Sequence, residues 1–270
     1  MSAAVAGVAQ RPPARRSPVP TSLAAFQAVR LLRHPLSLAG FALTVVVVVL
    51  SSRQSPQDAF SAVTSSPTFY YGVPVFFAAN LVASRERRAH SDELLAPTAT
   101  SEQRRTAAML TATLAPAAAV AVLVVVVHAV LLAGHRYVEV PGFWYMAQVP
   151  VTVLGAGLLG VAVARWFPVR GASFVVMVAL VAWDVWTSNH PYTVRLLGLY
   201  VEWPSYGVTT EWAGVFPGSP ALHVVYLAAL CGLAAVGAML PGSGRRRVPL
   251  LALGGLLVVL AGVAGTVQLP

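Results

Sequence analysis

Seven apolar runs recur along the chain, separated by short stretches that hold arginine, proline or glycine. A bilayer core about 30 Å thick needs roughly 17 to 25 apolar residues in a helix. Four runs are long enough by themselves: 107–133, 143–164, 221–240 and 248–268. Three shorter runs need their flanking Ser, Thr or Trp residues: 36–50, 69–83 and 172–187. The pattern predicts an all-α fold, a polytopic helical membrane protein with about seven transmembrane helices.

Composition argues against a protein that faces water on all sides. Hydrophobic residues make up 57% of the 270 and charged residues only 10%, with a mean hydropathy of +0.72. Soluble domains carry about 25% charged residues. All 18 basic residues are arginine, which excludes a P-loop lysine, a Schiff-base lysine and pyridoxal enzymes of the ordinary kind.

The net charge of +9 resides in arginines that lie between the apolar runs. They do not form a stripe interleaved with exposed aromatics, so the pattern indicates a membrane and not a nucleic-acid partner. With the N-terminus inside, 15 arginines fall on inner segments and only Arg53, Arg136 and Arg195 on outer loops. The positive-inside rule then predicts a multi-pass inner-membrane protein with a cytoplasmic N-terminus and the last run ending outside.

The region before the first run divides into two parts. Residues 1–20 are rich in Ala, Pro and Arg, and we expect a disordered cytoplasmic tail. Residues 21–34 predict an amphipathic helix on the inner membrane interface. The apolar side of this helix consists of Leu23, Phe26, Val29 and Leu32. The polar side consists of Gln27, Arg30 and His34. The alternative is an early first turn of the first span.

Known catalytic signatures are missing. The sequence has no nucleotide-binding or hydrolase motif of the common kinds. A single cysteine, Cys231, excludes an intrachain disulfide and a Cys-rich zinc site. No histidine lies at helical spacing with another histidine or a carboxylate inside an apolar run. We therefore expect no catalytic residues, no bound metal and no cofactor.

Two polar residues inside apolar runs are candidates for a transport path, since such groups are expensive in a bilayer. His128 lies within the third run, and Asp184 lies one turn from the outer end of the fifth, between Trp183 and Trp186. The alternatives are a hydrogen bond from His128 to a neighbouring helix and a solvated or arginine-paired carboxylate.

Small residues in the fourth and seventh runs predict close helix approach within one subunit rather than a dimer face. They are Gly155, Gly157, Gly160, Gly254, Gly255, Gly262 and Gly265.

The inner segment 85–105 is the most charged stretch of the chain. Ser91 can cap a short helical turn that contains Asp92, Glu93, Leu94 and Leu95, with the acids near the positive helix end. Ser101 then begins the third span. A short helix with apolar tips and charged sides suits docking of a soluble partner, whereas an ordinary solvated loop is the alternative.

Several segments resemble permease subunits of ATP-binding-cassette (ABC) exporters of the second type, particularly actinobacterial ones. They are the stretches 80–88 (NLVASRERR), 92–97 (DELLAP), 104–107 (RRTA), 29–35 (VRLLRHP) and 220–230 (PALHVVYLAAL). The resemblance implies a coupling helix in the first inner loop that contacts a separate ATPase, which binds the ATP. The contact residues implied are Arg87, Arg88, Asp92, Glu93, Leu94, Leu95 and Pro97.

The resemblance also implies a six-span core over 35–240 with an external segment at 188–220. The further apolar run in 241–270 departs from that pattern: either it is an appended seventh helix or the count of spans before it is wrong by one, and the arginine partition favours the appended helix. The external segment is rich in aromatics, and Val194, Leu197 and Val201 fit a short helix. Re-entrant half-helices that close an outer gate, with Trp203 and Tyr206 among the gate residues, are one interpretation. An aromatic belt at the membrane interface is the other.

Three functional hypotheses follow. The first is a permease subunit that moves a hydrophobic or amphipathic substrate outward, paired with a second copy or a related permease in the lipid bilayer and driven by a cytoplasmic ATPase. The second is a non-transporting membrane scaffold or assembly factor. The third, an intramembrane enzyme using His128 or Asp184, is disfavoured because no nucleophile and base share a helix face.

Overall fold

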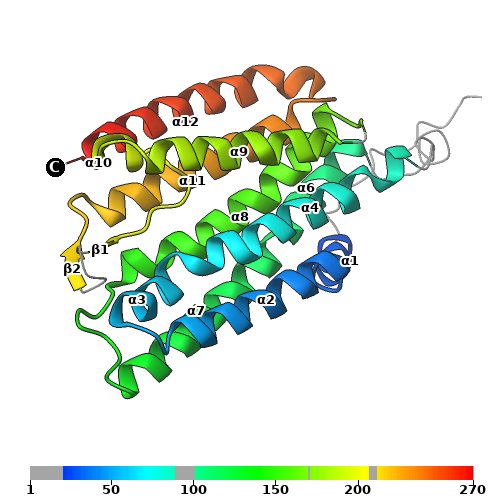
Figure 1. Ribbon diagram of the computed structural model, residues 1–270. Coiled ribbons are helices and arrows are strands. Elements are labelled where there is room, and N and C mark those ends of the chain that lie inside the picture. Colours follow the sequence, from blue (N-terminus) through cyan, green and yellow to red (C-terminus); the bar gives the residue numbers. More distant parts are fainter. Residues whose placement is uncertain (1–20, 89–100, 170, 207–211, 270) are drawn as a thin grey trace, which may run out of the picture.

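The computed structural model describes residues 21–88, 101–169, 171–206 and 212–269. Helices account for 78% of these residues, and most of the long ones run along one common direction (Figure 1). The mainly helical class predicted from the sequence is confirmed for this part of the chain. The chain positions Asp92, Glu93, Leu94, Leu95 and Pro97 lie outside the described residues.

The described residues form the following helices and strands, given in chain order. The helices are α1 (Thr21–Leu32), α2 (Pro35–Ser51), α3 (Pro56–Thr64), α4 (Ser66–Arg88), α6 (Glu102–Ala112), α7 (Leu114–Ala133), α8 (Phe143–Trp166), α9 (Ala172–Ser188), α10 (Tyr192–Arg195), α11 (Pro220–Met239), the short η1 (Gly244–Arg246) and α12 (Arg247–Val267). Two short antiparallel strands, β1 (Pro204–Tyr206) and β2 (Trp212–Val215), complete the fold.

Every predicted apolar run lies in a helix, but not every such helix is both long enough and apolar enough to cross a membrane. Four in the described part are long and apolar enough: α6 with α7 as one 32-residue helix, α8, α11 and α12. A fifth is α1 with α2, if this pair, bent by 56°, counts as one span. The bend lies between α1 and α2, and Leu31 of α1 is fully buried. α9 is shorter, with 17 residues.

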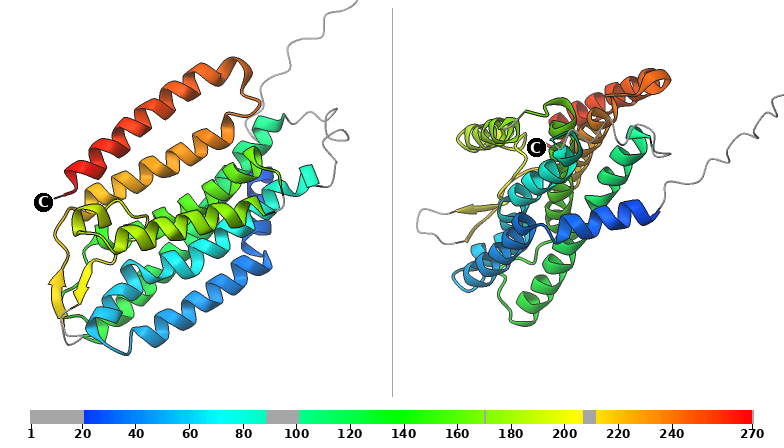
Figure 2. Two further views of the ribbon diagram at one scale, coloured as in Figure 1. Left: turned by 45° about the horizontal axis from the view of Figure 1, so that its top comes forward. Right: turned by 90° about the vertical axis from the view of Figure 1, so that its right-hand side faces the viewer.

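Arginines segregate to the two ends as the sequence predicted. Arg30 and Arg33 lie at the end of α1, Arg104 at the start of α6, Arg165 at the end of α8 and Arg247 at the start of α12, all on the side of the molecule that we call the basic end. The opposite end carries β1 and β2 (Figures 1 and 2), and we call it the hairpin end. Arg53 follows α2, Arg136 follows α7 and Arg195 ends α10, so all three lie at the hairpin end.

The core is a row of helices with α8 in its middle. The helices α12, α11, α8, α4 and α2 pack side by side in that order, and the α4–α8 contact is the most extensive. Figure 2 shows α9 on one face of the row and α6 on the other. α8 therefore carries most of the packing that holds the bundle together.

Glycines of α8 set the helix spacing. A Cβ on Gly160 would lie 2.3 Å from the Phe76 carbonyl oxygen of α4, and Asn80 Nδ2 donates to the Gly160 carbonyl oxygen at 3.2 Å. A Cβ on Gly157 would meet Thr113 at 2.9 Å. These contacts lie within one chain, as predicted. On α12, in contrast, nothing lies within 4 Å of a Cβ on Gly255 or Gly262.

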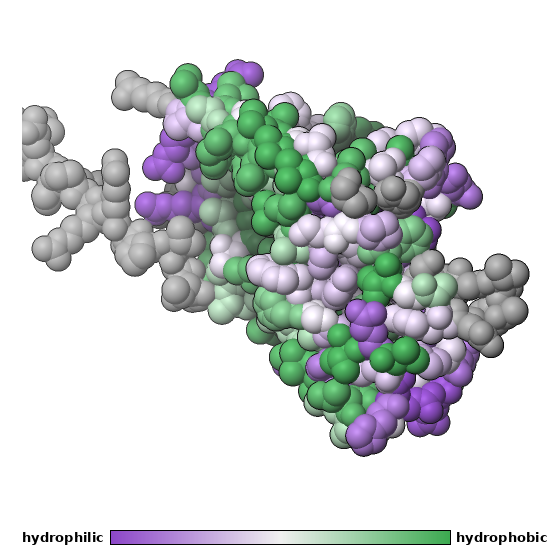
Figure 3. Space-filling model, turned by 90° about the vertical axis from the view of Figure 1, so that its left-hand side faces the viewer, coloured by the Kyte–Doolittle hydropathy of each residue, from purple (hydrophilic) through white to green (hydrophobic). Residues whose placement is uncertain are grey.

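The flanks of the bundle expose large apolar side chains. On α7, Val122 and Val125 are 64% and 63% exposed, and on α12 Leu256 is 64% exposed. Figure 3, seen from the hairpin end, shows green apolar bands on the flanks and mostly purple and white residues at the end itself. Such extensive apolar flanks are typical of surfaces that contact lipid or another protein.

Two features at the hairpin end were not predicted from the sequence. α3 follows α2, and the β1–β2 hairpin interrupts the segment between α10 and α11. The expected short helix through Val194, Leu197 and Val201 is wrong in extent, since α10 ends at Arg195. The segment leaves the helix there because Leu196 and Val201 turn into the core, where each is 1% exposed.

Substituting Gly160 with alanine should weaken the bundle. Because the new Cβ collides with a backbone oxygen, we expect Gly160→Ala to destabilise the protein by about 1–3 kcal/mol or more. Thermal unfolding of the purified protein in detergent measures the effect. Gly255→Ala is the matched control, and it should be neutral or stabilising by up to about 1 kcal/mol. Equal midpoints for the two variants would contradict the close α4–α8 contact.

Candidate functional site

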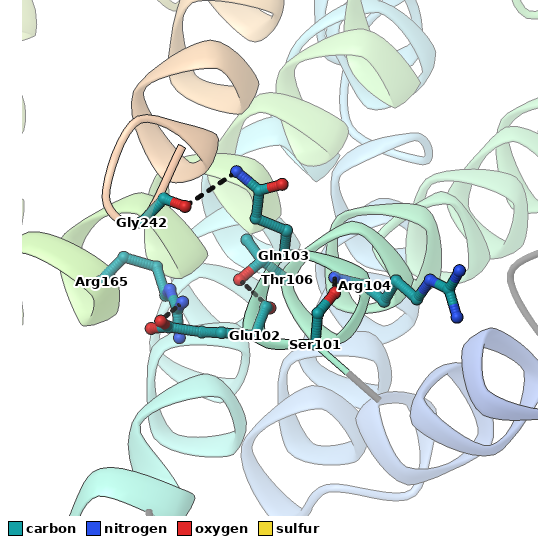
Figure 4. A network of polar contacts seen from close by, with 7 residues as sticks. All are labelled: Ser101, Glu102, Gln103, Arg104, Thr106, Arg165 and Gly242. Carbon is teal, nitrogen blue, oxygen red and sulfur yellow. Dashed lines mark hydrogen bonds and ion pairs between the residues drawn. The ribbon is translucent and has the colours of Figure 1, made fainter. Parts of the chain in front are cut away.

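A network of polar contacts fixes the start of α6 at the basic end (Figure 4). Ser101 caps the helix by accepting a hydrogen bond from the Arg104 N–H at 3.3 Å. Glu102 forms an ion pair with Arg165 at the end of α8. Gln103 Nε2 donates to the Gly242 carbonyl oxygen, 3.0 Å away in the turn between α11 and α12. The start of α6 is thereby tied to the end of α8 and to the turn between α11 and α12.

This network lies at the end of the bundle where α4 ends and α6 begins. Arg87 and Arg88 end α4, and Ser101 stands immediately before α6. The structure thus places both helices that flank the segment 89–100 at the basic end. Ser101 begins the third apolar helix as predicted.

A buried amide organises the hairpin end. Gln148 of α8 is 3% exposed, and its Oε1 accepts from Trp203 Nε1 at 3.0 Å. Its Nε2 donates to the carbonyl oxygens of Thr64, at the end of α3, and of Val201. Trp203 itself is fully buried. One side chain therefore joins α3, α8 and the segment that precedes β1.

A second buried amide, Gln268, holds the other side of that segment. Its Nε2 donates to the Leu196 carbonyl oxygen at 2.7 Å, and its Oε1 lies 3.1 Å from His223 Nδ1 on α11. The Gln268 carbonyl oxygen also accepts from the Ser219 N–H at 3.0 Å. Gln268, just past α12, thus fastens the segment between α10 and α11 to the bundle.

The predicted path residue His128 lies elsewhere. Its Nδ1 is 3.2 Å from the hydroxyl of Tyr137, in the loop that follows α7. Burial raises the pKa of Tyr137 above the usual value of tyrosine, so its hydroxyl stays protonated at physiological pH. The expected hydrogen bond to a neighbouring helix is therefore wrong in its partner, which belongs to the loop after the same helix.

A cavity of about 480 Å³ lies between α9 and the row formed by α4, α8 and α11. Its walls are mainly apolar, with Gly72, Val73, Ala156, Leu159, Leu180 and Leu227 among them. Cys231, the single cysteine, also lines it. The cavity exists because α9 packs loosely on the row, and only Thr187 of α9 is buried.

Asp184 lines this cavity at its hairpin end. Its Oδ1 accepts a hydrogen bond from the Leu199 N–H at 2.8 Å, and the backbone of Tyr200 also bonds the carboxyl group. Within the described chain no arginine pairs with Asp184, because Arg195 faces Glu202 at 4.0 Å and stacks on Phe216. Backbone donors, rather than an arginine, hold this carboxylate.

The structure does not bring the four predicted path residues together. Asp184 lines the cavity, whereas Trp203 packs in an aromatic cluster with Phe60 and Tyr145. Tyr206 ends β1. Sequence reasoning missed Gln148 and Gln268, although a polar side chain inside an apolar run is the same signal that singled out His128.

The described residues contain no group of three or more His, Cys, Asp or Glu side chains that could hold a metal ion.

Comparisons with protein-family models, curated proteins and solved structures find no match to this chain.

Replacing Gln148 with leucine should loosen the hairpin end. The change leaves the Trp203 indole N–H and two carbonyl oxygens buried without partners, and each such group costs about 1–3 kcal/mol. We expect Gln148→Leu to lower stability by at least about 2 kcal/mol and to speed amide hydrogen exchange at residues 196–203.

Gln103→Leu is the control at the other end, because Gln103 makes an exposed hydrogen bond to Gly242. It should cost less than about 1 kcal/mol and leave exchange at 196–203 unchanged. If both variants alter that segment equally, Gln148 is not its anchor.

Proposed function

We propose that the chain is the membrane-spanning subunit of an ABC exporter of the second type, acting with a separate cytoplasmic ATPase. It would work beside a second copy or a related permease and move a hydrophobic or amphipathic substrate outward. The observation that carries this proposal is the half-open cavity between α9 and the α4–α8–α11 row, since a scaffold needs no such space lined by apolar groups and a carboxylate.

The apolar helices support a place in a bilayer. A helix of 21 residues, such as α12, spans about 31 Å, close to the thickness of a bilayer core. We propose seven crossings, formed by α2, α4, α6 with α7, α8, α9, α11 and α12. The exposed apolar flanks would then contact lipid, where they incur no hydration cost.

The segregation of arginines supports the orientation. The basic end would face the cytoplasm, because cytoplasmic segments are enriched in arginine. The hairpin end, with Arg53, Arg136 and Arg195, would face outward. The N-terminal region before α1 would then be cytoplasmic.

The geometry of α6 supports contact with an ATPase. α6 and α7, taken together as one span over 102–133, have 32 residues and are about 48 Å long, which exceeds a bilayer core by about 18 Å. Its first residues are charged and tied to Arg165 and Gly242. A push on the segment 89–100 would therefore pass through α6 to α8 and to the α11–α12 turn.

An affinity pull-down from native membranes tests the proposal. The detergent-solubilised protein should co-purify with a stoichiometric ATPase that carries nucleotide-binding motifs, identified by mass spectrometry. Reproducible recovery of the intact, folded chain without an ATPase would contradict the exporter function and favour the scaffold.

Neutralising the acids of the predicted coupling segment should uncouple the ATPase. In the double variant Asp92→Asn, Glu93→Gln we expect the stimulation of ATP hydrolysis by the permease to fall about tenfold, which corresponds to about 1.4 kcal/mol of activation free energy. Membrane insertion should be unchanged. Glu139→Gln is the control, because Glu139 is exposed at the hairpin end. Unchanged coupling in the double variant would remove these acids from the contact.

A further inference from the structure

We propose that the cavity between α9 and the α4–α8–α11 row binds an apolar organic cation, with Asp184 as its counter-charge. As a statement about substrate class, this inference rests on the proposed transport function. As a statement about binding, it concerns this chain alone.

The size and walls of the cavity suit a small amphipathic molecule. Its volume of about 480 Å³ lies within the range of about 300–1,000 Å³ that is usual for small-molecule sites. It extends from Asp184, one turn before the end of α9, to Trp166 and Gly237, near the ends of α8 and α11 at the basic end. An elongated ligand can therefore place a polar head at one end and an apolar body along the rest.

The charge of the lining selects a cation. Asp184 is the only acidic or basic side chain among the described residues that line the cavity. Its two backbone donors offset part of the cost of a carboxylate in apolar surroundings. The nearby Arg195 is engaged with Glu202 and Phe216. A positively charged ligand would supply the missing opposite charge, whereas an anion would meet repulsion.

Aromatic side chains in the lining add a second preference for a cation. Phe69 and Phe76 of α4, Trp166 of α8 and Tyr200 beside Asp184 all line the cavity. The faces of aromatic rings attract cations, and delocalised or quaternary cations lose little hydration when they enter such a site. Combined with a single carboxylate, this lining favours a bulky apolar cation over a small inorganic one.

The outer wall of the cavity is suited to admitting a ligand. Only Thr187 of α9 is buried, and Phe174 and Val175 are 65% and 67% exposed. α9 therefore has little packing against the row to lose when it moves outward. A ligand could enter sideways past α9 from the surrounding apolar phase.

Tetraphenylphosphonium and tetraphenylborate test the charge preference, because they have nearly the same shape and opposite charge. Binding to the purified chain in lipid nanodiscs, corrected for empty nanodiscs, should be saturable for the cation and at least tenfold weaker for the borate. In Asp184→Asn the cation should bind at least tenfold more weakly. The asparagine oxygen can still accept from the Leu199 N–H, so the fold is kept. Asp184→Glu should restore selectivity, and Glu139→Gln should have no effect.

A filled cavity tests the location. Ala156→Phe places a ring inside the cavity and should abolish saturable tetraphenylphosphonium binding. Ala129→Phe on the exposed side of α7 is the matched control and should bind as the wild type does. Equal binding of the two probes, or cation binding that survives in Ala156→Phe, would overturn the proposal.

These results are independent of the exporter hypothesis. The binding measurements use the chain without an ATPase, so a failed pull-down leaves the cation site standing. Conversely, a chain that co-purifies with an ATPase but shows no preference for the cation would keep the exporter function and refute this substrate class.

Discussion

The close contact of α4 with α8 is the constraint on which the rest of the molecule depends. Gly160 lets the Phe76 carbonyl oxygen approach to a distance that no side chain could tolerate, and Asn80 bonds across the contact. α8 then packs α11 on its other side, and α2 and α12 extend the row. The positions of both polar ends follow from this row, because α8 carries Gln148 near one end and Arg165 near the other.

At each end of the row, hydrogen bonds and ion pairs of polar side chains join the elements, whereas apolar packing joins the helices in the interior. At the basic end an ion pair and an amide join α6, α8 and the α11–α12 turn. At the hairpin end Gln148 and Gln268 satisfy backbone groups of the segment 196–203, which has no regular helix or strand to do so. A polar group that is buried and bonded on several sides has few alternative positions. The ends are therefore more firmly defined than the flank occupied by α9.

The cavity described above lies on that flank, beneath α9. α9 shares few contacts with α4 and α8, and the gap it leaves is bounded by apolar walls and one carboxylate. Protein interiors usually pack as densely as organic crystals, so the gap beneath α9 is an exception within this bundle. A ligand can occupy it without displacing packed side chains, which is what the proposed transport would need.

The sequence by itself determined the helical class, the apolar runs and the sorting of arginines to two ends, because hydrophobic length and loop charge are local properties. It also indicated Ser101 as a helix start and Gly160 as a point of close approach. It did not reveal α3, the β-hairpin or the anchoring roles of Gln148 and Gln268, since their partners lie dozens of residues away. Only the tertiary structure separated Asp184, at a cavity, from Trp203, in the core, because side chains in one aromatic-rich stretch of sequence reach different neighbours once the chain folds.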